Sequence, residues 1–199
     1  MKRLILSLIT VLLTMGAAAN SLRLPPIFES GMVLQQQADV EIWGWAEPGS
    51  RVILTTSWSN KTATGTAGKN GRWSVTAVTP VASYDPQTLT VESGRQKIEL
   101  DDVLIGDVWF VSGQSNMQMS FTGNPDQPVE NAQKILLRSR YQNIRLFRVE
   151  TGYALHESDT TTINGAWYPA DPNNVKLFSV VGFVFGEKIH NLTGIPIGL

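Results

Sequence analysis

One short polar block carries the residue types in this chain that could do chemistry. It runs from Ser112 to Met117 (SGQSNM) and directly follows the apolar run from Val103 to Val111. A serine hydroxyl can act as a nucleophile in acyl transfer when a base removes its proton and N–H donors stabilise the oxyanion. Ser115 is therefore the candidate nucleophile.

The same block also fits a purely structural role. Ser and Asn are preferred turn and helix-cap residues, so Ser115 or Asn116 could cap the helix that follows. No base stands beside the block in the sequence. Local chemistry alone leaves both interpretations open.

Partners for a serine nucleophile are scarce. The chain has two histidines. His156 falls in a polar connection, and His190 lies off the apolar face of a predicted helix, where a cap-associated role is expected. Asp101, Asp102 and Asp107 are more typical of solvated strand ends than of the facing carboxyl pair of a glycosidase. With no cysteine, and with two histidines that lack a nearby paired carboxylate, no metal site is predicted.

The apolar run before the block predicts where the block lies. Val103 to Val111 is too continuously apolar for a half-solvated strand and predicts one buried on both faces, as in a parallel α/β sheet. Such a strand delivers Ser115 to the carboxyl edge of the sheet, where α/β enzymes hold their sites.

The rest of residues 101–199 fits the same class. A helix is expected around residues 129–136, a strand over 143–150 and a long polar connection over 151–174. A further helix with Gly194 as its C-cap has one apolar face and much of a second, which predicts that it is buried. Its first face holds Phe178, Val181, Gly182, Phe185, Ile189 and Leu192, and its second holds Val180, Phe183 and Val184. Because residues 195–199 begin another apolar strand, we expect an incomplete α/β domain, and hence a fragment of a longer chain.

Residues 20–100 predict a different class of domain. Short β-rich runs alternate with Gly, Pro, Asn and Asp, which indicates an all-β, jelly-roll-like sandwich. Four tryptophans in this part allow two interpretations, stacking on sugar faces or packing in the core, and core packing is favoured. They are Trp43, Trp45, Trp58 and Trp73.

Residues 1–19 are typical of a signal peptide. A basic start and an apolar stretch lead to three small residues, and the stretch is short for a membrane span of about 20 residues. We therefore expect a secreted or periplasmic protein without stable membrane insertion.

The formal net charge of −1 and the lack of a dense Lys/Arg run exclude the usual footprint of nucleic-acid binding. A neutral, sugar-like substrate fits this charge better than a polyanion.

Several segments, in order, resemble the sialate O-acetylesterase family, the SGNH-type carbohydrate esterases. The Gly-Gln-Ser-Asn-Met run at 113–117 looks like that family's nucleophile block. The other matching segments are LPPIFESGMVLQQ (24–36), IWGWAEPGS (42–50), GRWSV (71–75), TLTV (88–91), DDVLIGDVW (101–109), NIRLFRV (143–149), FSVVGFVFGEKIH (178–190) and GIPIGL (194–199).

The resemblance implies a β-sandwich followed by the first part of a flavodoxin-like SGNH hydrolase domain. It implies removal of O-acetyl groups from sialic acids or other acetylated carbohydrates, with no cofactor. Ser115 would form the acyl-enzyme, with its own N–H as one oxyanion donor and with Gln114 and Asn116 shaping the turn. In the wider fold, later blocks supply a Gly and an Asn to the oxyanion hole and an Asp-x-x-His base. Neither His156 nor His190 matches that motif, so the chain is expected to be catalytically incomplete.

Two other functions compete with the esterase interpretation. The first is a secreted carbohydrate-binding module in which the β-sandwich and its tryptophans act without catalysis. The second is a scaffold fragment with no activity.

Overall fold

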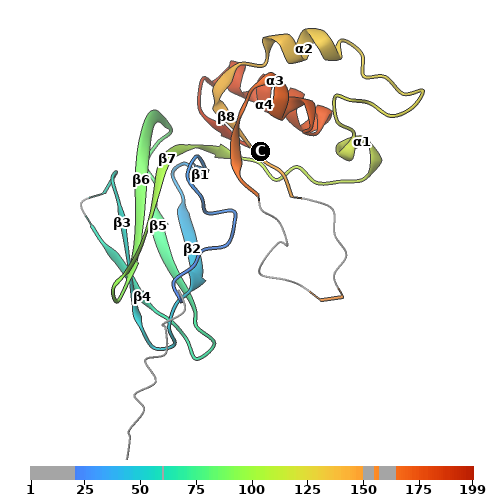
Figure 1. The fold of residues 1–199 in the computed structure, drawn as a ribbon. Coiled ribbons are helices and arrows are strands. Elements are labelled where there is room, and N and C mark those ends of the chain that lie inside the picture. Colours follow the sequence, from blue (N-terminus) through green and yellow to red (C-terminus); the bar gives the residue numbers. More distant parts are fainter. Residues whose placement is uncertain (1–20, 60, 150–154, 157–164) are drawn as a thin grey trace, which may run out of the picture.

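The computed structural model describes residues 21–59, 61–149, 155–156 and 165–199, so the expected signal peptide lies outside the described residues. These residues form a β-rich lobe followed by a lobe that contains the helices (Figure 1). The strands are β1 (Val33–Gln35), β2 (Asp39–Trp45), β3 (Arg51–Thr56), β4 (Ala63–Thr66), β5 (Arg72–Val78), β6 (Ser83–Ser93), β7 (Gln96–Val108), β8 (Tyr141–Phe147), β9 (Trp167–Ala170) and β10 (Ile197–Gly198). The helices are α1 (Ser115–Gln118), α2 (Ala132–Arg138), α3 (Pro172–Lys176) and α4 (Val180–Thr193).

The first lobe is all-β in its described residues, as the sequence predicts. The pair β2–β5 packs against a larger sheet in which β4, β3, β6 and β7 are neighbours. Alternating residues of β5 are buried, because successive side chains of a strand point to opposite faces. The core between the two sheets contains Ile42 and Val75 from the pair and Val52 and Val91 from the larger sheet.

The long strand β7 belongs to both lobes. Its first part pairs antiparallel with β6, and its last two residues pair in parallel with β10. Because β10 also pairs in parallel with β8, the end of β7, β10 and β8 form a run of three parallel strands, with β9 added antiparallel to β8. Strand β1 also pairs in parallel with β7. The sequence predicts separate strands on either side of residue 100, but Gln96–Val108 forms one continuous strand.

The predicted burial of the run from Val103 to Val111 is only partly correct. Val103, Leu104 and Ile105 are buried, whereas Val108 and Trp109 are exposed and Phe110 is 90% exposed. The strand ends at Val108, and the chain leaves the sheet before the apolar run is finished. Hydrophobicity does not indicate the end of the strand at Val108, because the residues that follow it are also apolar.

Two further elements lie inside the predicted connection at 151–174. Residues 167–170 form β9, and Asp171 starts α3 by accepting hydrogen bonds from the N–H groups of Asn173 and Asn174, both at 2.8 Å. An Asp cap followed by proline at the first helical position is a standard helix start. The prediction of a connection is therefore wrong for residues 167–174. Strands and helices this short show too little hydrophobic periodicity to be predicted from it.

The predicted helix α4 ends as expected, but its buried face differs. Gly194 has a φ of 66° and donates its N–H to the His190 carbonyl at 2.8 Å, which makes it the C-cap. Phe183, from the face predicted as secondary, is fully buried, whereas Val181, Phe185 and Leu192 are exposed. The expected burial of both faces is therefore not found among the described residues.

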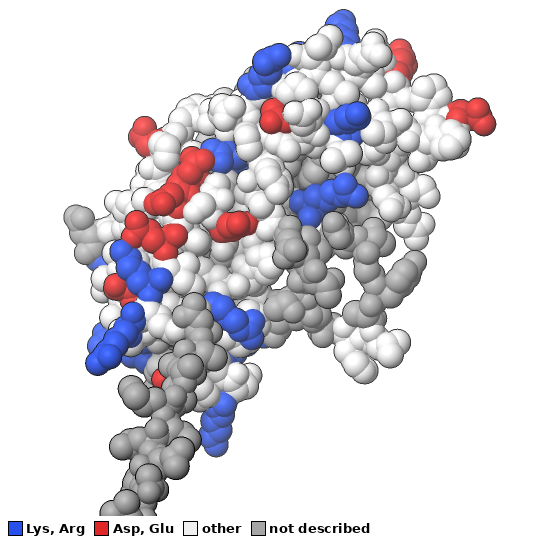
Figure 2. All heavy atoms as spheres, in the orientation of Figure 1, with Lys and Arg blue, Asp and Glu red and all other residues white. Residues whose placement is uncertain are grey.

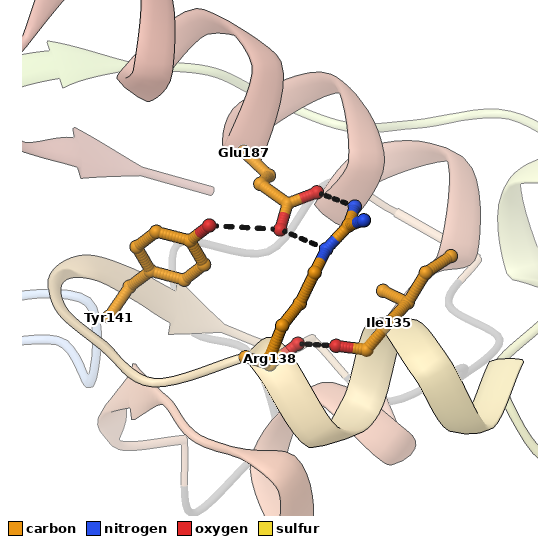
Figure 3. A network of polar contacts seen from close by, with 5 residues as sticks. Ile135, Arg138, Tyr141 and Glu187 are labelled. Atoms are coloured by element: carbon orange, nitrogen blue, oxygen red, sulfur yellow. Dashed lines mark hydrogen bonds and ion pairs between the residues drawn. The ribbon is translucent and has the colours of Figure 1, made fainter.

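A polar network fixes the buried side of α4 (Figure 3). Glu187 is 4% exposed, accepts hydrogen bonds from Arg138 Nε at 3.0 Å and Tyr141 Oη at 3.0 Å, and forms an ion pair with Arg138. A buried carboxylate is tolerated only when such partners satisfy it. Burial raises the pKa of the Tyr141 phenol above its ordinary value; a hydrogen bond with Asn191 opposes this, and the bond to Glu187 adds to it.

We predict that replacing Gly106 by Ala strongly destabilises the protein. A Cβ at position 106 would lie 2.1 Å from the Pro196 carbonyl oxygen, and backbone cannot move aside without breaking the β7–β10 pairing. We expect a loss of at least about 2 kcal/mol in the free energy of unfolding, measured in urea. Gly68→Ala is the matched control, because its Cβ would come no closer than 3.3 Å, to the side chain of Asn70. Equal stability of the two variants would contradict this role of Gly106.

We also predict that Tyr141 makes stability depend on alkaline pH. The native state holds the phenol proton more tightly than the unfolded chain, in which tyrosine titrates near pH ~10. This contribution is fully present below that pH and is lost as pH rises through the higher native pKa. Urea unfolding across alkaline pH should show a steeper loss for the wild type than for Tyr141→Phe. Parallel curves would rule out the raised pKa.

Candidate active site

The three residues predicted from the nucleophile block lie together on the surface. Gln114, Ser115 and Asn116 are exposed at the start of α1, six to eight residues after the end of β7. They line an open depression of about 400 Å³, whose other lining residues are Ser112, Gly113, Met117 and Val181. The structure thus gathers the predicted site residues in one place.

The turn that presents Ser115 is tight and made by backbone contacts. The Gln114 carbonyl accepts the N–H of Gln118 at 3.0 Å, and the Ser115 carbonyl accepts that of Met119 at 3.1 Å. A Cβ on Gly113 would lie 3.0 Å from the Cβ of Met117, so glycine lets the turn close on the first residues of α1.

The hydroxyl of Ser115 is not used to build this turn. Gln114 occupies the N-cap position and makes no side-chain cap bond. Within the described residues, the Ser115 side chain has no hydrogen-bond partner, and it is exposed. The structural interpretation, in which Ser115 or Asn116 caps the helix, is therefore wrong.

Contacts with the start of α4 hold the turn in place. The Met119 carbonyl accepts the N–H of Val180 at 2.9 Å, next to a β-bridge between Ser120 and Ser179. Ser179 also caps α4 by accepting the N–H of Gly182 at 3.1 Å, and its hydroxyl lies 3.5 Å from the sulfur of Met117. The turn that presents Ser115 and the first turn of α4 are therefore one packed unit.

Neither histidine lines the depression. His156 is exposed. The Nδ1 of His190 lies 2.7 Å from the Ile195 carbonyl, and its ring packs edge-on against Tyr84 and Tyr141. His190 also follows Val181 by nine residues, about 14 Å along the helix axis. The expectation that His190 is associated with the helix end is confirmed.

The aspartates near the strand are engaged elsewhere. Asp102 forms an ion pair of 2.8 Å with the buried Arg145, and Asp107 accepts hydrogen bonds from the Nε2 atoms of Gln35 and Gln36. Asp101 and Asp102 are exposed, as predicted, but they lie in the middle of β7, whereas Asp107 is the last residue but one of the strand. In the described parts of the chain, no three His, Asp or Glu side chains gather where they could hold a metal ion.

The tryptophans of the β-sandwich offer little open ring surface. Trp73 is 2% exposed, and Trp58 donates its indole N–H to the Val78 carbonyl. Trp43 and Trp45 are half-buried, and an arginine lies over one face of each ring: the guanidinium carbon of Arg72 is 4.8 Å from the centroid of Trp43, and that of Arg23 is 3.7 Å from the centroid of Trp45. Each cation–π pair occupies one face on which a sugar could otherwise stack.

Comparison with known proteins confirms the resemblance predicted from the motifs. The chain is 30% identical over 98% of its length to the sialate O-acetylesterase of Rattus norvegicus, and 28% identical over 92% to that of Homo sapiens. It spans 38% and 37% of those proteins. A carbohydrate acetylesterase from Xanthomonas citri superposes over 88% of this chain and 38% of its own, with a TM-score of 0.80 and 28% identity. No family model matches the chain.

If Ser115 has no structural task, removing its hydroxyl should leave the fold intact. We predict that Ser115→Ala changes the free energy of unfolding by less than about 0.5 kcal/mol. Ser179→Ala, which removes a helix cap, should cost about 1 kcal/mol. Urea denaturation of both variants measures the difference. A Ser115→Ala variant as unstable as Ser179→Ala would point back to a structural role.

Proposed function

We propose that this chain is the N-terminal part of a serine carbohydrate esterase that removes O-acetyl groups from acetylated sugars. The observation that carries the proposal is Ser115, whose exposed hydroxyl is without a partner among the described residues. The similarity to sialate O-acetylesterases extends over nearly the whole chain and includes the segment around Ser115. Ser115 follows the carboxyl end of β7, which pairs in parallel with β10, and β10 pairs in parallel with β8; this edge of a parallel sheet is where α/β enzymes hold their chemistry.

In the proposed reaction, Ser115 Oγ attacks the carbonyl carbon of the acetyl ester, and its proton passes to a general base. The backbone N–H of Ser115, in the first turn of α1 where such groups lack intrahelical partners, stabilises the oxyanion. The bond to the sugar oxygen breaks, and that oxygen takes the proton. Water then hydrolyses the acetyl-enzyme, which releases acetate and restores Ser115.

The general base is proposed to come from polypeptide beyond these 199 residues. His190 is bound to the Ile195 carbonyl, and neither histidine lines the depression. The curated relatives are much longer than the stretch they share with this chain. On this proposal, the three parallel strands and α4 are the first part of a flavodoxin-like SGNH domain, and the chain alone is inactive.

An acetylated neutral glycan, or a sialic acid, is the proposed substrate class. On the face shown in Figure 2, basic and acidic side chains are interspersed, which leaves no continuous basic stripe there for a polyanion. The alternative of a non-catalytic binding module receives less support, because Arg23 and Arg72 each cover one candidate stacking face, on Trp45 and Trp43 respectively.

Export is also part of the proposal. It depends on the signal-like pattern of residues 1–19, which lie outside the described residues. Within the described ranges, no helix combines the length and apolar character needed to cross a membrane.

The decisive experiment is acetate release by the full-length protein that carries this chain. With an aryl acetate or an O-acetylated sugar as substrate, Ser115→Ala should lower kcat by at least about 10³-fold, because the acyl-enzyme cannot form. Thr122→Ala is the matched control, since Thr122 carries an exposed hydroxyl near α1 but does not line the depression, and it should keep most of the activity. Turnover that survives in Ser115→Ala would refute the assignment.

A further inference from the structure

The depression around Ser115 has one polar side and one apolar side. Ser112 to Asn116 supply hydroxyl, amide and backbone groups. The apolar side is formed by Met117 and by Val181, which is 48% exposed. Among the described lining residues, Val181 is the one that comes from outside the nucleophile block.

Val181 is held at a fixed place relative to Ser115. Its neighbour Val180 donates its N–H to the Met119 carbonyl at 2.9 Å, one residue beyond α1. On its other side, Gly182 packs so closely that an added Cβ would lie 3.0 Å from Val111. A β-branched side chain in a helix is also restricted to one main rotamer. Val181 therefore forms a stiff surface and not an adaptable one.

We infer that Val181, together with Met117, forms the wall against which the acyl group of the substrate packs, and that Val181 selects for short acyl groups. This inference depends on the proposed function. In the tetrahedral intermediate, the carbonyl carbon carries Ser115 Oγ, an oxyanion, the sugar oxygen and the acyl methyl. The oxygens require the polar side of the depression and its N–H groups. The methyl is the one apolar substituent, and contact with Val181 and Met117 removes it from water.

The same geometry predicts that acetyl is preferred to longer chains. A propionyl or butyryl group extends from the methyl position toward Val181, whose two γ-carbons cannot rotate away. Discrimination of one methylene in an apolar pocket is about 10- to 200-fold. Because Val181 is half-exposed, the lower end of that range applies.

The test compares Val181→Ala with Val184→Ala in the full-length protein. Val184 is also an exposed valine of α4, 39% exposed, but it does not line the depression. The measurement is kcat/KM for aryl acetate, propionate and butyrate. In Val181→Ala the ratio of butyrate to acetate turnover should rise about tenfold, and in Val184→Ala it should equal that of the wild type. Thermal unfolding of both variants verifies that the fold is kept.

The outcomes separate this inference from the proposed function. If Ser115→Ala is inactive and Val181→Ala keeps the wild-type ratio, the acyl-wall inference is overturned and the esterase proposal stands. A similar rise in Val184→Ala would also overturn it, because the effect would then be general to α4. If Ser115→Ala keeps its activity, both the proposed function and this inference fail.

Discussion

The close approach of β7 to β10 is the contact on which the second lobe depends. At Gly106 the strand passes so near the Pro196 carbonyl that a side chain cannot fit, and the next residue, Asp107, donates its N–H to the same carbonyl at 3.0 Å. The strand is shared: its earlier residues lie in the sandwich core, and its end starts the parallel sheet. Strand β7 therefore anchors the turn that presents Ser115 to the packed core of the first lobe.

Two further sets of contacts hold α4 in place. At the middle of the helix, Glu187 is bound by Arg138 and Tyr141, which flank the loop between α2 and β8 (Figure 3). At its N-terminal end, Ser179 caps the helix and contacts the turn after β7. The depression lies between two elements that other contacts hold in place, and a rigid support of this kind is what the proposed nucleophile Ser115 would need.

Sequence patterns predicted the elements with long or strongly marked signals. The all-β first lobe, the C-cap at Gly194 and the position of Ser115 after a buried strand all follow from periodicity, turn residues and apolar runs. The buried face of α4 did not follow, because the helix is apolar on both sides and periodicity cannot rank two such faces. Gly186 was the overlooked signal: a Cβ on this residue would lie 2.5 Å from Leu199, so the face that carries it is the one that packs closely. The contribution of Val181 to the depression was also missed, since it depends on the packing of α4 against the turn.

The exposed apolar residues of α4 have a place in the proposed chemistry. Phe185 lies one turn beyond Val181 and contacts the ring of Trp109, with centroids 5.0 Å apart. A stripe of apolar surface therefore runs from the end of β7 along α4 to the depression. Attack on an ester is favoured where water is excluded around the oxyanion donors, because electrostatic stabilisation weakens in a high dielectric. An open depression flanked by an apolar stripe is what the esterase proposal requires of this part of the site, and on that proposal the base is supplied by the rest of a longer protein.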